Sequence, residues 1–169
     1  MKDHEGMTPL FYAASIGYLK GVESLLRKTT KCCVYNERDA YGFYPIHIAS
    51  WKGHIKVVEK FLHEYPDMIE LLTAKGQNIL HVAAKYGKAK VVAYMLKGND
   101  FQMLINEKDK DGNTPLHLAS KGSHPRVVSI LTWDKRVSLK SLNNDGKTAL
   151  DIAVDNSGNN PSFRKVCDH

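Results

Sequence analysis

Histidine is the residue type in this sequence with the widest range of chemistry. The chain has eight histidines, and an imidazole can hold zinc or transfer protons near neutral pH. His47, His81 and His117 occupy the same position in three similar phrases. Stacked units that each supply one histidine stand about 10 Å apart, whereas a Zn–N bond measures about 2 Å. We therefore expect each imidazole to hydrogen-bond the backbone of an adjacent turn and to stiffen the stack, and we expect the same of His54 and His124.

Two other patterns resemble known motifs only in part. Gly146-Lys147-Thr148 matches the end of a phosphate-binding loop, but Ser141 stands where that loop needs its first glycine. Asp109 and Asp111 flank a predicted turn and are typical of Asx-turns. The sequence therefore predicts no catalytic residue, no cofactor, no metal site and no enzymatic activity.

The cysteines indicate a reducing compartment. Cys32, Cys33 and Cys167 are odd in number and two of them are adjacent, which is not typical of a disulfide framework. No pair has the spacing of a zinc site.

Length and composition fit one folded domain of 169 residues. The chain is 43% hydrophobic and 25% charged, which excludes a largely disordered protein. The net charge of +6 slightly favours anionic partners. The N-terminus has no apolar signal-peptide core, and the apolar stretches fall far short of the roughly 18 residues that a membrane span needs. The sequence as given therefore predicts a soluble, cytoplasmic chain.

Five similar phrases must position these side chains. Their turn glycines are Gly6, Gly42, Gly76, Gly112 and Gly146, separated by 36, 34, 36 and 34 residues. A fixed period of this length indicates a stacked array of repeats, in which each unit covers the apolar face of its neighbour.

Each phrase predicts a turn followed by a short helix. A helix N-cap is expected at Thr8, Asn78, Thr114 and Thr148, followed by proline at the first helical position at Pro9, Pro45 and Pro115. Tyr44 stands at the cap position of the second phrase, so we expect that cap to be lost.

A second short helix follows an inter-helix glycine at Gly17, Gly53 and Gly87. In the fourth phrase the glycine comes one place early, at Gly122. The core positions expected in the second helices are Val22, Leu25, Leu26, Val57, Val58, Phe61, Leu62, Val91, Val92, Met95, Leu96, Val127, Val128 and Leu131. Residues 66–72 could add a further helical turn.

The complete phrase at Gly112 to Ala119, Gly-x-Thr-Pro-Leu-His-x-Ala, resembles the ankyrin-repeat signature. The resemblance implies an all-α solenoid of about five turn-helix-turn-helix units over residues 1–156. The repeats are 3–36, 39–70, 73–106, 109–140 and 143–156, and residues 157–169 are expected to be a C-terminal linker or tail. The first repeat resembles a unit from within an array, so we expect an exposed apolar end and modest stability or self-association.

Several stretches resemble the plant accelerated-cell-death type of ankyrin membrane proteins. They are Gly76 to Lys88, Leu104 to Ala119, Asn143 to Ala153 and Pro161 to Lys165. The resemblance implies a role in plant defence or stress signalling on the cytosolic side of a membrane, and normally further repeats upstream. In that family several transmembrane helices follow the repeats. This sequence contains none, so membrane attachment is expected only through a part missing from it.

The turn tips and the outer ends of the first helices line the concave side of such an array, where partners bind. The partner-binding residues predicted there are Tyr41, Phe43, Trp51, Lys52, Lys75, Gln77, Lys85, Tyr86, Lys110, Asp111, Asn113 and Lys121. The corresponding positions of the first repeat are His4, Glu5, Met7, Ser15 and Ile16. Aromatic rings clustered with lysines are typical of binding hot spots. The alternative is that some of these rings pack against neighbouring turns and serve only stability. Trp51 is the strongest single candidate.

Two functions are consistent with this pattern. The first is a non-enzymatic module that holds a protein partner on the concave face, without a small-molecule substrate. The second is an electrostatic binder of nucleic acid or anionic membrane lipid through its basic surface. The lysines are scattered among acidic residues and no recognition helix is evident, which favours the first.

Overall fold

The computed structural model describes residues 7–30, 34–35 and 38–157, which form two compact units. Unit 1 extends to Ile79 and unit 2 begins at Leu80. The described residues form helices and turns, with no β-strand among them. His4, Glu5, Cys32, Cys33 and Cys167 lie outside these ranges, so the predictions made for them remain predictions.

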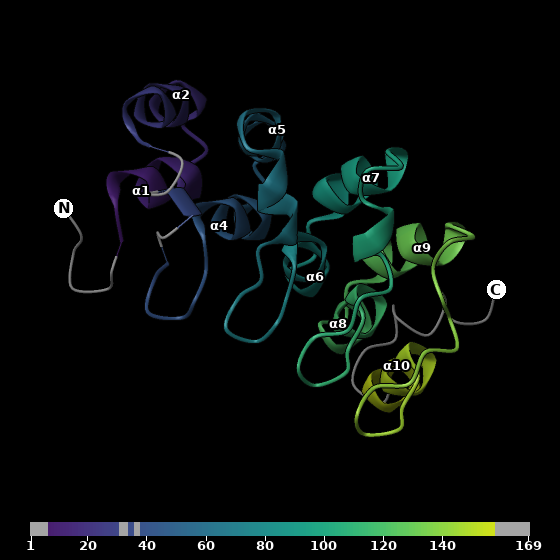
Figure 1. The fold of residues 1–169 in the computed structure, drawn as a ribbon. Coiled ribbons are helices and arrows are strands. Elements are labelled where there is room, and N and C mark those ends of the chain that lie inside the picture. The colour runs from purple at the N-terminus through teal and green to yellow at the C-terminus, as the bar shows by residue number, and fades with distance from the viewer. Residues whose placement is uncertain (1–6, 31–33, 36–37, 158–169) are drawn as a thin grey trace. The chain divides into compact units, whose positions relative to one another are not determined.

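Unit 1 contains two helix pairs, α1 (Pro9–Ser15) with α2 (Leu19–Lys28) and α4 (Pro45–Lys52) with α5 (Ile55–Glu64). The first helices α1 and α4 pack side by side, and so do the second helices α2 and α5 (Figure 1). A 3₁₀ helix, η1 (Pro66–Glu70), follows α5 and confirms the extra helical turn expected there.

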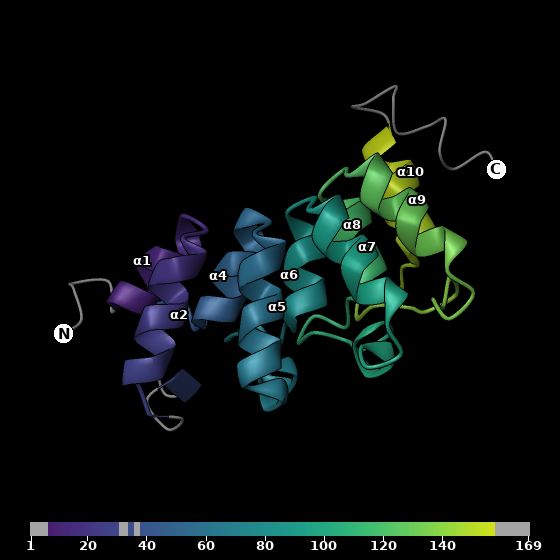
Figure 2. The same ribbon diagram turned by 90° about the horizontal axis from the view of Figure 1, so that it is seen from above.

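Unit 2 repeats the same arrangement. It contains α6 (Ile79–Lys85), α7 (Ala89–Lys97), η2 (Gln102–Leu104), α8 (Pro115–Lys121) and α9 (Pro125–Trp133). A final first helix, α10 (Ala149–Ser157), packs against α8, while α7 packs against α9 (Figure 2). The predicted turn-helix-turn-helix unit is therefore confirmed in both units.

The first helices begin where proline and a hydroxyl cap predict. Thr8 Oγ1 accepts a hydrogen bond from the Phe11 N–H at 3.5 Å, and Thr148 Oγ1 accepts one from the Asp151 N–H at 3.2 Å. Pro9, Pro45 and Pro115 each occupy the first helical position. These caps satisfy N–H groups that have no partner inside the helix.

Tyr44 gives no side-chain hydrogen bond to its helix, as its residue type predicts. The N-terminus of α4 is nevertheless satisfied by an imidazole, because the Tyr44 N–H donates to His47 Nδ1 at 3.3 Å. The Thr114 N–H donates to His117 Nδ1 in the same way, at 3.2 Å. A histidine at the third helical position thus takes over part of the capping.

The same imidazoles bond the next repeat along the chain. Since Nδ1 of His47 and of His117 accepts a hydrogen bond, Nε2 carries the proton. It donates to the Leu71 carbonyl at 3.1 Å from His47 and to the Lys147 carbonyl at 3.1 Å from His117. His81 Nε2 lies 3.0 Å from the Asn113 carbonyl. The predicted hydrogen bonds to turn backbone are confirmed.

Two further imidazoles bond the preceding repeat. His54 Nε2 lies 3.0 Å from the Ser15 carbonyl at the end of α1. His124 Nε2 lies 2.9 Å from the Lys85 carbonyl at the end of α6. Each of these histidines follows an inter-helix turn. At the junction of the third and fourth repeats, His81 and His124 together bond α6 near both of its ends.

Apolar side chains of the second helices fill the space between them and the first helices. The predicted positions that are buried are Val22, Leu26, Val57, Val58, Phe61, Val91, Val92, Met95, Val127, Val128 and Leu131. Leu25, Leu62 and Leu96 are only half-buried, at the edges of the apolar stripes. Ala13, Ala49 and Ala83 are buried in first helices, where their small side chains permit close packing.

The inter-helix turn of the fourth repeat differs from the other three. Gly17, Gly53 and Gly87 have φ between 69° and 87°, and the matching left-handed position is Ser123, with φ of 52°. Gly122 has an ordinary φ of −79°. Glycine is needed there for space, because an added Cβ would lie 2.7 Å from the His124 ring and 2.9 Å from the Lys85 carbonyl.

The buried histidines predict acid sensitivity. Burial lowers the pKa of His47 from 6.5 to about 3 and also lowers the pKa of His81 and of His117. Below pH 6.5 these histidines are protonated in the unfolded chain but stay neutral in the folded chain. The free energy of unfolding should therefore be constant above about pH 7.5 and should fall below about pH 6.5. Each histidine contributes up to about 1.4 kcal/mol per pH unit.

Urea denaturation at a series of pH values measures this slope. The variant His47→Gln should be less stable at neutral pH by about 1 kcal/mol, through the lost hydrogen bonds, and should show a shallower slope below pH 6.5. Equal slopes for the two proteins would contradict the assignment of proton uptake to His47.

Ser123 predicts a stabilising substitution. A left-handed backbone costs a non-glycine residue about 1–2 kcal/mol, so Ser123→Gly should raise the free energy of unfolding by about 0.5–1 kcal/mol. Ser129→Gly, inside α9, is the matched control and should lower the free energy by about 0.5–1 kcal/mol. Opposite signs in urea denaturation are expected, and the same sign for both would refute the strain at Ser123.

Candidate interaction surface

The predicted partner-binding residues divide between the two units. Those in unit 1 are Tyr41, Phe43, Trp51, Lys52, Lys75 and Gln77, and those in unit 2 are Lys85, Tyr86, Lys110, Asp111, Asn113 and Lys121. The predicted proximity of Trp51 to Tyr86 therefore stays a prediction.

A tight turn presents the first aromatic side chain of unit 1. Asp39 Oδ1 accepts hydrogen bonds from the Tyr41 N–H at 2.9 Å and from the Phe43 N–H at 2.8 Å. The Gly42 N–H donates to the Asp39 carbonyl at 3.0 Å, closing the turn. The Asp39 N–H also donates to the Phe43 carbonyl at 3.0 Å. From this turn the Tyr41 side chain projects with 73% of its surface exposed.

Phe43 connects this turn to helix α4 through ring contacts. Its ring centroid lies 6.1 Å from that of Trp51, with the planes tilted by 40°, and 6.1 Å edge-on from the His47 imidazole. The Lys52 ammonium lies 4.7 Å from the Trp51 ring centroid, within the range of a cation–π interaction. Phe43 and Trp51 are half-buried and Lys52 is exposed, so the contact with Phe43 orients the Trp51 ring.

The next turn of unit 1 packs directly against the first. A Cβ added at Gly42 would lie 2.7 Å from both the nitrogen and the Cβ of Ala74, so no larger residue fits between the turns. Lys75 follows Ala74 at the tip of this second turn and is exposed. Tyr41, Phe43, Trp51, Lys52 and Lys75 together are called the Trp51 surface below.

Gln77 does not belong to this surface. Only 3% of the residue is exposed, and its N–H donates to Thr73 Oγ1 at 3.2 Å. Phe43 in the second repeat and Gln77 in the third hold the same position after the turn glycine, but the Gln77 side chain is buried.

In unit 2, Lys85 and Tyr86 at the end of α6 form a similar pair. The Lys85 ammonium lies 5.3 Å from the Tyr86 ring centroid, and burial raises the pKa of the Tyr86 hydroxyl. Lys110, Asp111 and Lys121 are exposed. This unit therefore offers one half-buried ring and several charges.

Asn113 is also unavailable to a partner. Only 3% of it is exposed; its Oδ1 accepts from Asn143 Nδ2 at 3.0 Å and its N–H donates to Asp109 Oδ1 at 2.9 Å. Asp109 Oδ1 also accepts from the Asp111 N–H, which confirms the predicted Asx-turn. The Asn113 side chain serves the junction between the fourth and fifth repeats.

The corresponding positions of the first repeat are less distinctive. Met7 and Ser15 are half-buried, and the Ser15 carbonyl is taken by His54. Ile16 is exposed over 70% of its surface and Tyr12 over 53%. An exposed apolar surface at this repeat agrees with the expectation from its sequence.

Trp133, the last residue of α9, is an exposed aromatic residue outside the predicted partner-binding positions. It is 85% exposed, the most of the large exposed hydrophobic residues described. Val127, Val128 and Leu131 define the buried stripe of α9, and Trp133 lies two residues beyond Leu131 on another face. That offset from the apolar stripe is the signal that could have identified it.

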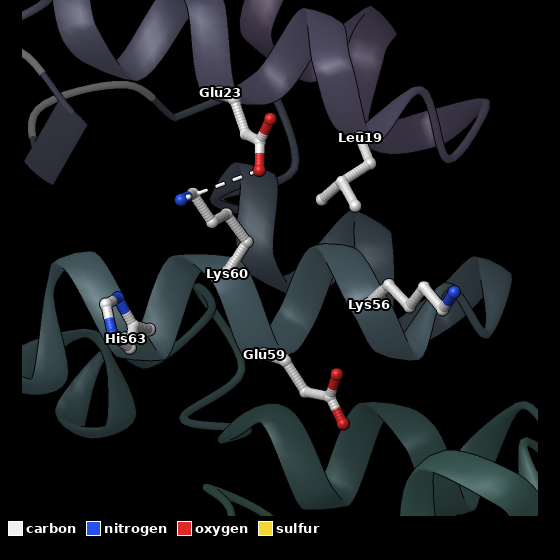
Figure 3. Close-up of a pocket in the computed structure, with 6 residues that line it drawn as sticks. All are labelled: Leu19, Glu23, Lys56, Glu59, Lys60 and His63. Carbon is white, nitrogen blue, oxygen red and sulfur yellow. Dashed lines mark ion pairs between the residues drawn. The ribbon is translucent and has the colours of Figure 1, made fainter.

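A groove of about 360 Å³ lies between α2 and α5 (Figure 3). Its lining residues are Leu19, Glu23, Lys56, Glu59, Lys60 and His63. Lys60 pairs with Glu23 at 3.6 Å and with Glu64 at 3.0 Å, which raises the pKa of Lys60 and lowers that of Glu64. Because lysines and glutamates both line it, the groove does not favour one sign of ligand charge.

The described residues contain neither a cluster suited to a metal ion nor a membrane-spanning helix. No group of three or more His, Cys, Asp or Glu residues in these ranges could hold a metal ion. Within the same ranges, no helix combines the length and the apolar character needed to cross a bilayer.

Comparison with known proteins gives a consistent family. A family model of ankyrin repeats matches in three copies, over residues 1–70, 47–140 and 80–169. The chain is 40% identical over 153 residues to Protein ACCELERATED CELL DEATH 6 of Arabidopsis thaliana, covering 90% of this chain and 22% of that protein. It is 33% identical over 114 residues to transient receptor potential cation channel subfamily A member 1 of Homo sapiens, covering 68% of this chain and 10% of the channel. The chain thus spans about a fifth or less of these relatives.

The contact between Phe43 and Trp51 predicts a spectroscopic change. In a Trp133→Phe background, Trp51 is the only tryptophan. Phe43→Ala should then move the fluorescence emission to longer wavelength, because the Trp51 ring gains water contact, and should lower the free energy of unfolding by about 1–2 kcal/mol. Tyr18→Ala removes an exposed ring of unit 1 and should leave the emission unchanged. An unchanged spectrum for Phe43→Ala would contradict the orienting role of Phe43.

Proposed function

Because the chain belongs to the ankyrin-repeat family, a family of protein-interaction modules, we propose that it binds a protein partner through the Trp51 surface and carries out no catalysis. The observation that supports this most directly is the Trp51 ring. It is half-buried, oriented by Phe43 and bordered by the Lys52 ammonium. Protein-binding hot spots are enriched in such aromatic residues.

The order of the local backbone also supports the proposal. Asp39 holds the turn that carries Tyr41 and Phe43, and Gly42 fixes that turn against Ala74. A surface that is ordered before binding loses little conformational entropy when a partner arrives. The large exposed fraction of Tyr41 adds apolar area that association would bury.

Within unit 2, we propose Lys85 and Tyr86 as further contacts for the partner. Lys85 holds the repeat position of Trp51, and Tyr86 holds that of Lys52, so the order of aromatic ring and ammonium group is reversed. Lys110, Asp111 and Lys121 are exposed charged residues of the same unit and are proposed as further contacts. We assign Gln77 and Asn113 no contact with the partner, because both are buried.

The proposed absence of catalysis rests on how the histidines are used. His47 and His117 accept at Nδ1 and donate at Nε2, so both ring nitrogens take part in repeat packing. A general acid or base needs a ring nitrogen that can reach a substrate. These two imidazoles are therefore better suited to structure than to proton transfer.

The biological setting that we propose is plant defence or stress signalling. The relative from Arabidopsis is named for accelerated cell death, and its match covers 90% of this chain. Attachment to a membrane, with the repeats on its cytosolic side, would depend on a part outside this sequence. We infer an intracellular partner of the signalling type.

An electrostatic binder of nucleic acid or anionic lipid is the weaker alternative. It has the net charge of +6 in its favour. Against it, the lysines are scattered among acidic residues along the sequence, and His47 stays neutral near physiological pH. Strong dependence of binding on salt would support this alternative.

Affinity capture from a plant-cell lysate tests the proposal. The bait should retain a protein partner as wild type and lose it when Trp51→Ala and Tyr86→Ala are combined. A single hot spot contributes about 2 kcal/mol, so the retained amount should fall about 30-fold or more. Trp133→Ala is the matched control, since it removes a more exposed tryptophan outside the proposed surface.

Circular dichroism must show equal helicity for all baits. A partner that the double variant still captures as well as wild type would refute the proposed surface. A partner lost from Trp133→Ala instead would move the binding surface to the end of α9.

A further inference from the structure

The Trp51 surface carries an excess of exposed positive charge. Lys52 and Lys75 are both exposed. Arg38, just before the Asp39 turn, is also exposed, and its guanidinium lies 4.6 Å from the Tyr44 ring centroid. The carboxylate in this turn is that of Asp39, whose Oδ1 already accepts two backbone hydrogen bonds. Two lysines at the edge of an apolar patch are therefore only partly offset by acid among the described residues.

The interior behind the patch adds no opposing charge. The His47 imidazole lies edge-on to the Phe43 ring and is fully buried. Burial lowers its pKa to about 3, so it is neutral at physiological pH. Ile46 and Ile48 on the same helix are also buried and uncharged. The electrostatic potential at the Trp51 surface is therefore set mainly by the exposed lysines.

The geometry of the Trp51 ring argues against a nucleotide base stacked on that ring. A base needs an open aromatic face. The Lys52 ammonium already lies over the Trp51 ring, and the Phe43 ring is tilted by 40° to the Trp51 plane. Ring edges and the exposed Tyr41 side chain remain, and these suit aliphatic or aromatic side chains of a peptide.

We propose that the segment bound at the Trp51 surface is an acidic peptide with one apolar anchor, its carboxylates beside Lys52 and Lys75 and its anchor against Tyr41 and Phe43. This inference rests on the proposed function and adds the chemistry of the partner. The contact between Gly42 and Ala74 places the two turns together, so one short segment can reach both Tyr41 and Lys75. The attraction would weaken with salt, because both lysines are exposed.

A selection from a random peptide library displayed on phage, against the whole chain, tests this chemistry without assuming a sequence. Enriched peptides should combine Asp or Glu with an aromatic or large aliphatic residue. The most enriched peptide is then synthesised, and its affinity is measured for four proteins. They are wild type, Trp51→Ala, the double variant Lys52→Glu/Lys75→Glu, and the control double variant Lys20→Glu/Lys90→Glu.

The control changes the net charge by the same amount. Lys20 and Lys90 are exposed in the first turns of α2 and α7, outside the Trp51 surface, and a glutamate is well tolerated at a helix N-terminus. We expect Lys52→Glu/Lys75→Glu to weaken binding about 10-fold or more, and the control to weaken it by about 2-fold at most. Trp51→Ala should abolish measurable binding.

The outcomes separate the two proposals. Peptides that need Trp51 but carry no acidic residues would overturn the acidic partner and leave the protein-binding surface intact. Peptides whose affinity is the same for wild type and Trp51→Ala would overturn both the proposed binding surface and the acidic partner. Binding of a single-stranded thymidine oligonucleotide that is lost in Trp51→Ala would also overturn the acidic partner, in favour of nucleic acid.

Discussion

A hydrogen bond from an imidazole N–H to a backbone carbonyl recurs at the junctions between repeats in both units. His47, His81 and His117 bond the following repeat, and His54 and His124 bond the preceding one. The helices have only 7–10 residues and would not persist alone in water. Their stability comes from neighbours, and these hydrogen bonds set the position at which each neighbour packs.

The Trp51 surface depends on this arrangement. Helix α4 carries His47 in its first turn and Trp51 in its last. The histidine that joins two repeats and the tryptophan of the surface therefore lie on the same short helix. Phe43 contacts both rings. The exposed face is thus built directly on a buried, hydrogen-bonded junction, which explains how a short turn and a short helix can hold an ordered apolar patch.

Much of the fold could be predicted because its signals are local and repeated. Proline at the first helical position and the period of the turn glycines placed the first helices correctly. The hydrogen bonds of the histidines followed from their shared position in each phrase. The turn of the fourth repeat was harder, since Gly122 marks a close approach by His124 and the left-handed residue is Ser123. A glycine in a sequence does not reveal which of these two reasons applies.

The candidate surface was only partly predictable, as two pairs of equivalent residues illustrate. Phe43 is half-buried whereas Gln77 is buried, and Asn113 is buried whereas Lys147 is exposed, although all four hold the same position in their phrases. Likewise, a Cβ at Gly112 would meet Asn144 at 2.7 Å, whereas one at Gly146 would meet nothing within 4 Å. Sequence alone determined the repeat, its helices and the residue types at each turn. Tertiary structure decided which of those side chains reach solvent, because exposure depends on what the adjacent repeat packs against each position, and local spacing does not encode that contact.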